Sequence, residues 1–403
     1  MSASVNILKF CILGSILRYL CQNYCPEDFL TSIAHAATED WNRVKEEIFL
    51  FRNPNVTEAS MALKEPPLFL FSLKALTSLL CDRLMFWILE ILGIFSFIIY
   101  DITMRKYSVN SLKTVWLPAA TFVYCFNPYT IFAFASQSVG IFSTLTVAWT
   151  FIGIASDHTT LASIMCAIGC YINIYSGYLL LAIVVQVRQT PIRVVKSVLA
   201  FVLCLGGLLL ASAHLDGDDW GFLRYTYLSN IFALDTTPNM GLFWYMYVEM
   251  FDHFNTFFVW TMQLLIFGTC VAATLRFYED PLFLAVILTM STGILRPYNS
   301  IADLGCSLAL AAHWRHLTPY FRNLLFTLGL MGTALILSPL FYFTWLRTAT
   351  SNANFYFAAA LIHSLGRVSA YSFPVCKNHF TCLSSPCPPS TSPHSPIRYS
   401  LVF

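Results

Sequence analysis

The most informative feature of this sequence is that it has few charged residues. Only 11% of its 403 residues are Asp, Glu, Lys or Arg, whereas 57% are hydrophobic. An average soluble domain has about 25% charged residues. The mean hydropathy is +0.64. A soluble fold of this size could not bury so much apolar surface, so the composition predicts a polytopic membrane protein.

Other absences narrow the function. The net charge of +2 gives no reason to expect a nucleic-acid partner. The 13 cysteines include no CxxC pair and no Cys/His zinc spacing, and most lie in apolar runs. We therefore expect buried small hydrophobic residues, with no metal and no cofactor. Cys21 and Cys25 flank a predicted loop, which leaves a disulfide between them open.

Apolar runs predict a single all-α membrane domain, residues 1–372, with about ten to twelve transmembrane helices. A first, tilted helix is expected over residues 5–20. A span needs about 20 residues, and several later runs are shorter or broken. These runs cover residues 66–81, 84–100, 115–135, 138–156, 161–186, 194–213, 242–275, 281–295, 301–313, 324–346 and 354–370.

Two longer polar segments, residues 22–64 and 214–236, are rich in Asp and Glu, and the first contains an amphipathic pattern, WNRVKEEIFLF. The short connections elsewhere carry Arg and Lys. The positive-inside rule places these in the cytosol and the two acidic segments opposite, which in a eukaryote is the lumen of the endoplasmic reticulum (ER). Asn55-Val-Thr57 is the only N-glycosylation sequon, as suits a luminal loop.

The last segment, residues 373–403, differs from everything before it. Pro, Ser and Cys dominate, and no hydrophobic period survives. Such a composition predicts a disordered, exposed tail.

The stretch from Leu234 to Thr261 combines many aromatic residues with Glu249, Asp252 and His253. Spacings of three and four predict that these three side chains share one helix face. Burying them among apolar residues costs several kcal/mol unless they are paired or reach water. A network that fixes helix packing and a site for a lipid head group both remain open, whereas a metal site would need further converging ligands.

Three segments bearing Asn and Pro interrupt apolar runs: FNPYT at 126–130, TPNMG at 237–241 and RPYN at 296–299. Asp303 follows the third closely enough to pair with Arg296. Irregular backbone is tolerated at membrane depth only where it is buried in protein or lines a cavity. Ordinary helix ends would also explain each break, but three of them favour a shared polar cavity.

Five segments resemble the class U subunit of the glycosylphosphatidylinositol (GPI) transamidase, over roughly residues 40–370. They are LDTTPNMGLFWYMYVEMFDHF, FNPYT, RPYNSIAD, HWRHLTPYFRNLLF and SNANFYFAAA. The resemblance implies a multi-pass ER membrane protein with an architecture related to lipid-linked GT-C mannosyltransferases.

The resemblance also implies a non-catalytic role in a complex with a caspase-like cysteine protease subunit and further membrane subunits. That complex cleaves a C-terminal signal from a precursor protein and attaches a GPI lipid. This subunit is expected to bind the GPI lipid, the signal, or both.

The resemblance suggests lipid-binding candidates in two of the matching segments. They are Asn239, Glu249, Asp252, His253, Asn352 and Asn354. A helix cap is the alternative for one of the last two. Asn299 stands where we expect the family to have proline, and after about Tyr371 the chain leaves the family pattern.

A second hypothesis is an active GT-C mannosyltransferase of GPI biosynthesis that uses dolichol-phosphate-mannose. Such an enzyme needs an acidic pair in its first luminal loop, and Glu39–Asp40 is the nearest candidate. A transporter is a third, since broken helices are typical of transporters, but no internal repeat is evident.

Overall fold

A computed structural model describes residues 2–26, 29–30, 39–52, 64–107, 118–217, 219–232, 235–314 and 323–384. All regular secondary structure within these ranges is helical, which confirms the predicted all-α class. Asn55 lies outside the described residues.

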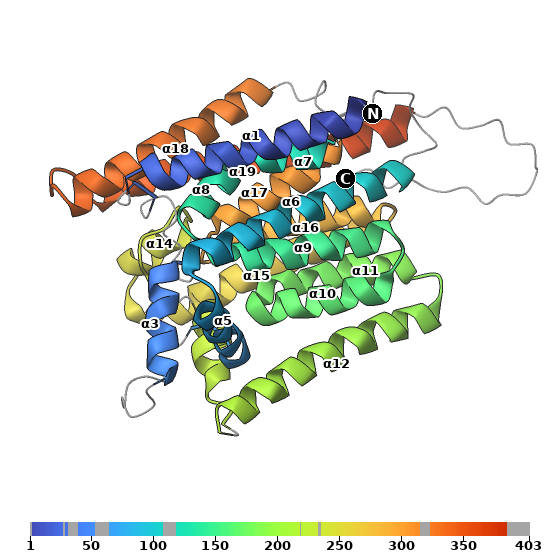
Figure 1. Ribbon diagram of the computed structural model, residues 1–403, viewed down its shortest axis with the longest axis horizontal. Helices are drawn as coiled ribbons and strands as arrows, with labels where there is room; N and C mark the ends of the chain where they lie inside the picture. Colours follow the sequence, from blue (N-terminus) through green and yellow to red (C-terminus); the bar gives the residue numbers. More distant parts are fainter. Residues whose placement is uncertain are drawn as a thin grey trace, which may run out of the picture.

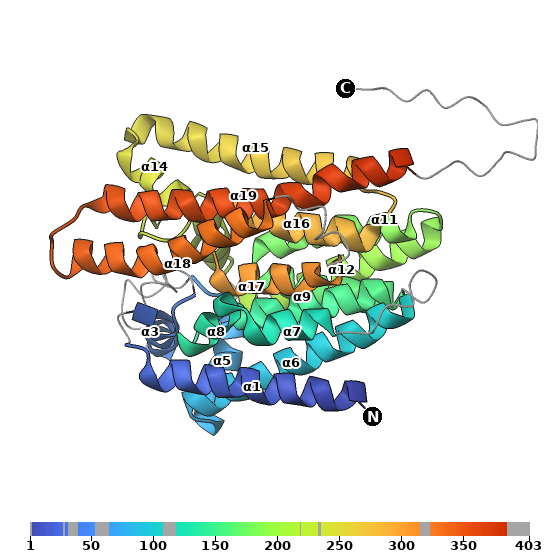
Figure 2. The same ribbon diagram turned by 90° about the horizontal axis from the view of Figure 1, so that it is seen from above.

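Most of the longer helices run roughly along one direction and form a bundle (Figures 1 and 2). They are α1 (Ser2–Tyr24), α6 (Asp82–Tyr107), α7 (Ala119–Phe126), α8 (Pro128–Ala135), α9 (Gly140–Ala155), α10 (Thr159–Ile172), α11 (Leu179–Val187), α12 (Pro191–Leu215), α15 (Asp252–Arg276), α16 (Pro281–Leu295), α17 (Ile301–Ala311), α18 (Leu324–Leu346) and α19 (Ala353–Ser384). Helix α5 (Pro67–Leu79) lies at a steep angle to them (Figure 1). A short 3₁₀ turn, Ile174–Tyr178, joins α10 to α11.

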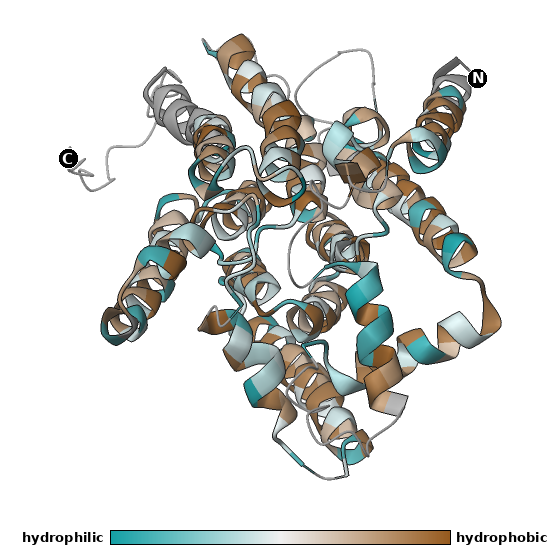
Figure 3. Ribbon diagram, turned by 90° about the vertical axis from the view of Figure 1, so that its left-hand side faces the viewer, coloured by the Kyte–Doolittle hydropathy of each residue, from teal (hydrophilic) through white to brown (hydrophobic). Residues whose placement is uncertain are grey.

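The two ends of the bundle differ. Two short helices, α3 (Trp41–Arg52) and α14 (Phe243–Glu249), lie at one end, which we call the α3 end, and the chain leaves α12 there (Figure 1). The α11–α12 connection lies at the opposite end. Figure 3 looks onto the α3 end, where the hydrophilic residues gather in the short helices and connections. The described parts of the two acidic segments meet at this end, and their luminal placement stays a prediction.

The described residues support part of the predicted number of membrane spans. Among the described residues, four helices are long and apolar enough to cross a membrane: α6, α12, α15 and α18. Six shorter apolar helices lie close to predicted runs, including 140–155 and 281–295. The ten to twelve spans and the GT-C-like architecture therefore stay predictions, while the membrane character is supported.

Apolar side chains of three of these four helices, α12, α15 and α18, face mostly outward, whereas those of α6 contribute to the core. In the most apolar stretch of each helix, only 11% of α12 and 22% of α15 is buried inside the protein, against 56% of α6. Leu203 on α12 and Phe257 on α15 are each more than 60% exposed. Lipid is as apolar as these side chains, so such exposure is expected of helices at the edge of a membrane bundle.

The main core lies among α6, α9, α10, α11 and α16 and is made of bulky side chains such as Phe97, Phe151 and Phe283. A second cluster joins α3 and α5 to α6, with Trp41 and Phe86 ring to ring. The predicted amphipathic helix is confirmed as α3. Its apolar face packs onto the bundle, and the indole of Trp41 donates to Asp82 at 3.0 Å.

The FNPYT segment breaks the chain into α7 and α8, as predicted. Pro128 has no N–H, so the Tyr124 carbonyl loses its helical donor. Arg18 of α1 supplies a replacement, donating to the carbonyl oxygens of Tyr124 at 2.9 Å and Cys125 at 2.8 Å. Asn127 caps α8 by accepting from the amide of Tyr129. Arg18 and the Asn127 cap therefore satisfy backbone groups at the break, so no ligand is needed to explain it.

The helical part of the chain extends beyond the start of the predicted tail. The last helix, α19, continues to Ser384. It therefore includes the first residues of the segment 373–403, which the composition predicted to be disordered. Residues 385–403 lie outside the described residues.

Candidate functional site

The break between α16 and α17 positions the most polar buried group of residues. Arg296 follows α16 in an extended conformation, which its position before Pro297 favours. Ser300 begins α17 by accepting from the amide of Asp303. This short loop brings Arg296 and Asp303 to the same side of the chain.

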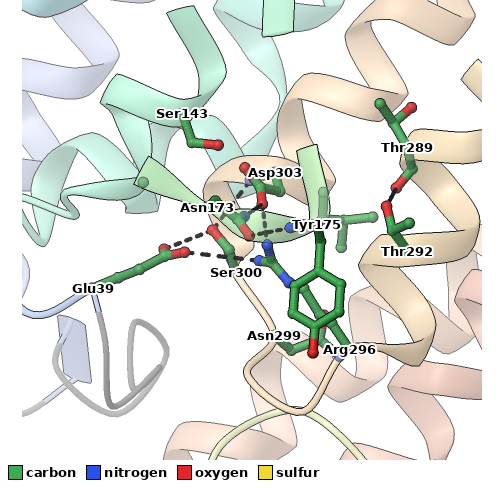
Figure 4. A network of polar contacts seen from close by, with 12 residues as sticks. Glu39, Ser143, Asn173, Tyr175, Thr289, Thr292, Arg296, Asn299, Ser300 and Asp303 are labelled. Carbon is green, nitrogen blue, oxygen red and sulfur yellow. Dashed lines mark hydrogen bonds and ion pairs between the residues drawn. The ribbon is translucent and has the colours of Figure 1, made fainter. Parts of the chain in front are cut away.

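The predicted Arg296–Asp303 ion pair is present (Figure 4). Nη1 of the arginine contacts Oδ2 of Asp303, which also accepts from the side-chain amide of Asn173 at 3.4 Å. Arg296 is 5% exposed. A buried guanidinium with one carboxylate on one side is held in a fixed orientation, so its other donors point in a defined direction.

Glu39 reaches the same group from the segment before α3. It accepts from the hydroxyls of Ser300 at 2.6 Å and Ser138 at 3.0 Å, and Oε1 lies 3.8 Å from Nη2 of Arg296 (Figure 4). Burial and the nearby Asp303 carboxylate raise the pKa of Glu39. Glu39 therefore ties the α3 end to α9 and α17.

Two adjoining cavities share the side chains of Asn173, Tyr175 and Arg296. The outer cavity has a volume of about 60 Å³ and the inner one about 30 Å³. A cavity of about 10–15 Å³ already holds one water, so the two together admit several waters or a small polar group. We call them the Arg296 crevice. Its walls further include Glu39, Lys64, Glu65, Ser143, Asn230 and Tyr298 in the outer cavity, and Thr289, Thr292, Asp303, Cys306 and Ser307 in the inner one.

A second polar cluster lies at the outer end of the crevice. The ammonium of Lys64 contacts the carboxylate of Asp235, and both side chains are more than a fifth exposed. The hydroxyl of Tyr298 accepts from the amide of Asp235 at 2.8 Å. Glu47 on α3 accepts from the amides of Lys64 and Glu65. The two acidic segments are thereby joined to each other beside an opening of the crevice.

The expected helix face of Glu249, Asp252 and His253 is not formed. Glu249 ends α14, and α15 begins only at Asp252, with Met250 and Phe251 extended between them. Glu249 and His253 are exposed rather than buried. The aromatic richness of the stretch suggested one buried helix, but the chain turns here from α14 into the lipid-facing α15. Whether these residues contact a lipid stays a prediction.

The remaining candidates have separate environments. Asn239 is fully buried, and its side-chain oxygen accepts from the amide of Gly241 at 2.7 Å, so it closes its own turn. Asn352 and Asn354 are exposed at the start of α19. The hydroxyl of Tyr245 on α14 donates to Asn354, and the Glu249 carboxylate lies close to the same hydroxyl. Glu249 and Asn354 are therefore brought together, although the sequence separates them widely.

The expectation that three breaks share one cavity is only partly met. Arg296 and Tyr298 of the third break line the crevice, whereas Asn127 of the first caps a helix. Asn299 accepts from Arg367 of α19. The sequence did not single out Asn173 and Tyr175. Their signal was a polar interruption, INIYSGY, inside the apolar run 161–186.

The side chains around the crevice carry a mixture of hydrogen-bond donors and acceptors. Within the described part of the chain, no group of three His, Cys, Asp or Glu side chains converges as metal ligands would. The donors and acceptors present instead suit hydrogen bonding to a polar ligand or to water.

Comparison with known proteins decides the family. The family model for the GPI transamidase subunit PIG-U matches residues 12–363. The chain belongs to the PIG-U family. The resemblance seen in the sequence is thereby confirmed.

Relatives in fungi and mammals agree with this assignment. The GPI transamidase component GAB1 of Saccharomyces cerevisiae is 30% identical over 329 residues, which are 81% of this chain and 82% of that protein. The GPI-anchor transamidase component PIGU of Mus musculus is 26% identical over 271 residues, and that of Homo sapiens over 275 residues. The chain matches 61% of the length of each of these two mammalian proteins.

The PIG-U match covers every part of the site described above. It includes Glu39, the break at Arg296 and the start of α19 with Asn354. The crevice and the α14–α19 contact are therefore features of the family region of this chain.

Proposed function

We propose that this chain is a non-catalytic subunit of a GPI transamidase complex in the ER membrane. It binds the GPI lipid, the C-terminal attachment signal of the precursor, or both, while a separate cysteine protease-like subunit carries the catalysis. The PIG-U match over residues 12–363 carries this proposal. The names of the relatives in yeast, mouse and human support it.

The distribution of polar groups supports a role facing the lumen. The acidic segments 22–64 and 214–236 are proposed as luminal, and their described parts meet at Lys64 and Asp235. The Arg296 crevice adjoins this contact and continues into an otherwise apolar bundle. A lipid whose acyl chains stay in the membrane could therefore present its polar head at this end.

The exposed cluster of Tyr245, Glu249 and Asn354 is a second place for the lipid head group or the signal. Trp244 beside it stacks on Trp345 of α18. Aromatic rings with neighbouring amide and carboxylate groups suit an interface where one side of the ligand is apolar and the other is hydrated. Asn352, Asp252 and His253 lie next to this cluster in sequence.

Rescue of cells that lack the endogenous subunit tests the proposal. We expect the wild-type chain to restore GPI-anchored protein at the cell surface and to co-purify with the protease-like subunit. Asn354→Ala and Glu249→Gln should lower the surface signal without lowering the amount of protein. Asn23→Ala is the matched control, because Asn23 is exposed and its side-chain amide donates to the Tyr19 carbonyl of its own helix. Full rescue by both site variants would refute the site assignment, and failure of the wild type would refute the function.

The alternative, a dolichol-phosphate-mannose-dependent mannosyltransferase, rests on Glu39, which lines the crevice. Two serine hydroxyls and Arg296 engage this carboxylate, which favours a structural role. The lipids of the knockout separate the two functions. Complete but unattached GPI supports the transamidase subunit, whereas a GPI precursor lacking mannose supports the transferase.

A further inference from the structure

One edge of the Arg296 guanidinium makes no hydrogen bond to the part of the chain that the structure describes. Asp303 occupies Nη1, but Nε and Nη2 have no hydrogen bond among the described residues. The nearest acceptor to Nη2 is Oε1 of Glu39, 3.8 Å away, which is too long for a hydrogen bond. The side chain is nine-tenths buried and lines both cavities of the crevice.

Nε and Nη2 of Arg296, which lack hydrogen bonds to the described residues, lie on the same edge of the guanidinium. Nε and Nη2 of a guanidinium donate in parallel, and this edge binds two oxygens of a phosphate or a carboxylate at once. Because Asp303 holds the opposite part of the group, the edge is already oriented before any ligand arrives (Figure 4). The Asp303 carboxylate balances the charge of this arginine and fixes its position, while Nε and Nη2 keep their hydrogen atoms available for a ligand.

Other groups in the outer cavity agree with an acceptor-rich ligand. The hydroxyl of Ser143 on α9 is buried, lines this cavity and has no hydrogen-bond partner among the described residues. Lys64 lines its outer end. Glu39 and Glu65 also line this space, and burial raises the pKa of both carboxyls, which favours their neutral forms and weakens their repulsion of an anion. The cavity of about 60 Å³ suits one ionic group and is far too small for a whole lipid.

We propose that the Nε–Nη2 edge of Arg296 binds one phosphate group, supplied by the head group of a membrane lipid that enters from the α3 end. Asp303 orients the arginine, and the Ser143 hydroxyl donates to a further phosphate oxygen. The choice of a lipid as the source rests on the proposed function, whereas the phosphate chemistry stands on the free edge alone.

Thermal unfolding of the full-length chain, purified in detergent, tests this. We expect phosphatidylinositol in mixed micelles to raise the Tm by a few degrees in a saturable way, and diacylglycerol, which lacks phosphate, to leave it unchanged. Arg296→Lys keeps a cation for Asp303 but lacks the two-donor edge, so the rise should be lost. Arg193→Lys, at an exposed arginine that pairs with Asp157, is the matched control and should keep it.

Inorganic phosphate shows whether the bound phosphate group comes from a lipid head group or from free phosphate. A Tm rise with phosphate but not with phosphatidylinositol, abolished by Arg296→Lys, supports the phosphate site and rejects the lipid source. No rise with either ligand, or an equal rise in Arg296→Lys, overturns the proposal and leaves water as the occupant. If Arg296→Lys does not fold, Ser143→Ala decides, because it leaves the ion pair intact: an undiminished rise overturns the proposal, and a reduced rise supports it.

This result is independent of the rescue assay. A chain that restores surface GPI-anchored protein but shows no Tm rise overturns the phosphate site alone. A phosphate-dependent Tm rise in a chain that rescues nothing overturns the proposed function and keeps the site.

Discussion

The guanidinium of Arg18 on α1 lies 2.6 Å from the carboxylate of Glu90 on α6, and neither side chain is more than 1% exposed. The same arginine donates to the two carbonyls freed at the α7–α8 break. Tyr124, which carries one of these carbonyls, donates its hydroxyl to Glu90 at 3.1 Å. One ion pair therefore fixes the first helix, the broken helix and α6 relative to each other.

Removing one member of this pair should destabilise the protein strongly. Arg18→Met leaves Glu90 as an uncompensated buried charge and removes the donor to the Cys125 carbonyl, while Thr130 still donates to the Tyr124 carbonyl. Breaking a buried pair in this way costs about 3–5 kcal/mol. Chemical unfolding in mixed micelles measures the loss. Arg193→Met, at a partly exposed pair, is the control and should change stability little. A variant of Arg18 as stable as the wild type would contradict the role of this pair.

The sequence predicted the break itself for a physical reason that the structure bears out. Proline lacks a donor, so FNPYT had to interrupt a helix. What closes the break was not predictable, because Arg18 lies more than 100 residues away and looked like the end of an apolar helix. Local chemistry fixes where a helix ends, whereas its long-range partner depends on packing.

Glu65 should make the protein less stable as pH rises. It is buried, and burial together with the Glu47 carboxylate raises its pKa well above the usual value. The folded state thus binds the proton more tightly than the unfolded state. Stability is then fully present below the unfolded pKa of about 4.3 and is lost as pH rises toward the folded pKa.

Glu65→Gln removes this titration. We expect a higher Tm than wild type at pH 8 and a smaller difference at pH 5. Glu46→Gln is the control, because Glu46 on α3 is exposed. A pH dependence of the Tm that is identical in Glu65→Gln and wild type would show that Glu65 is not the group that titrates.

Asn299 should hold Arg367 through a single charged hydrogen bond. The amide oxygen accepts from Nη1 of Arg367, and both side chains are buried. Hydrogen bonds to charged groups contribute about 1.5–3 kcal/mol, so Asn299→Ala should lose stability in this range. A double-mutant cycle with Arg367→Met measures the coupling by chemical unfolding. Zero coupling would mean that this hydrogen bond does not help to hold α19.

The candidate site was only partly predictable. The pairing of Arg296 with Asp303 followed from their closeness in sequence, and it is present. The face of Glu249, Asp252 and His253 was wrong, because helical spacing was applied across a stretch where the chain leaves the helix at Met250. The approach of Glu39 to Arg296 joins residues 257 apart, and no local pattern contains it.

Tyr245 and Asn354 allow a structural role to be separated from a ligand-binding role. The tyrosine hydroxyl donates to the Asn354 amide oxygen and links α14 to α19. If this link is all that matters, Tyr245→Phe and Asn354→Ala remove the same hydrogen bond and should lower surface GPI-anchored protein equally. If Asn354 contacts the lipid or the signal, Asn354→Ala should lower it several-fold more, because Tyr245→Phe leaves the amide in place. Flow cytometry of rescued cells at equal protein level measures the difference. We expect the larger loss in Asn354→Ala, and equal losses would assign both residues to helix packing.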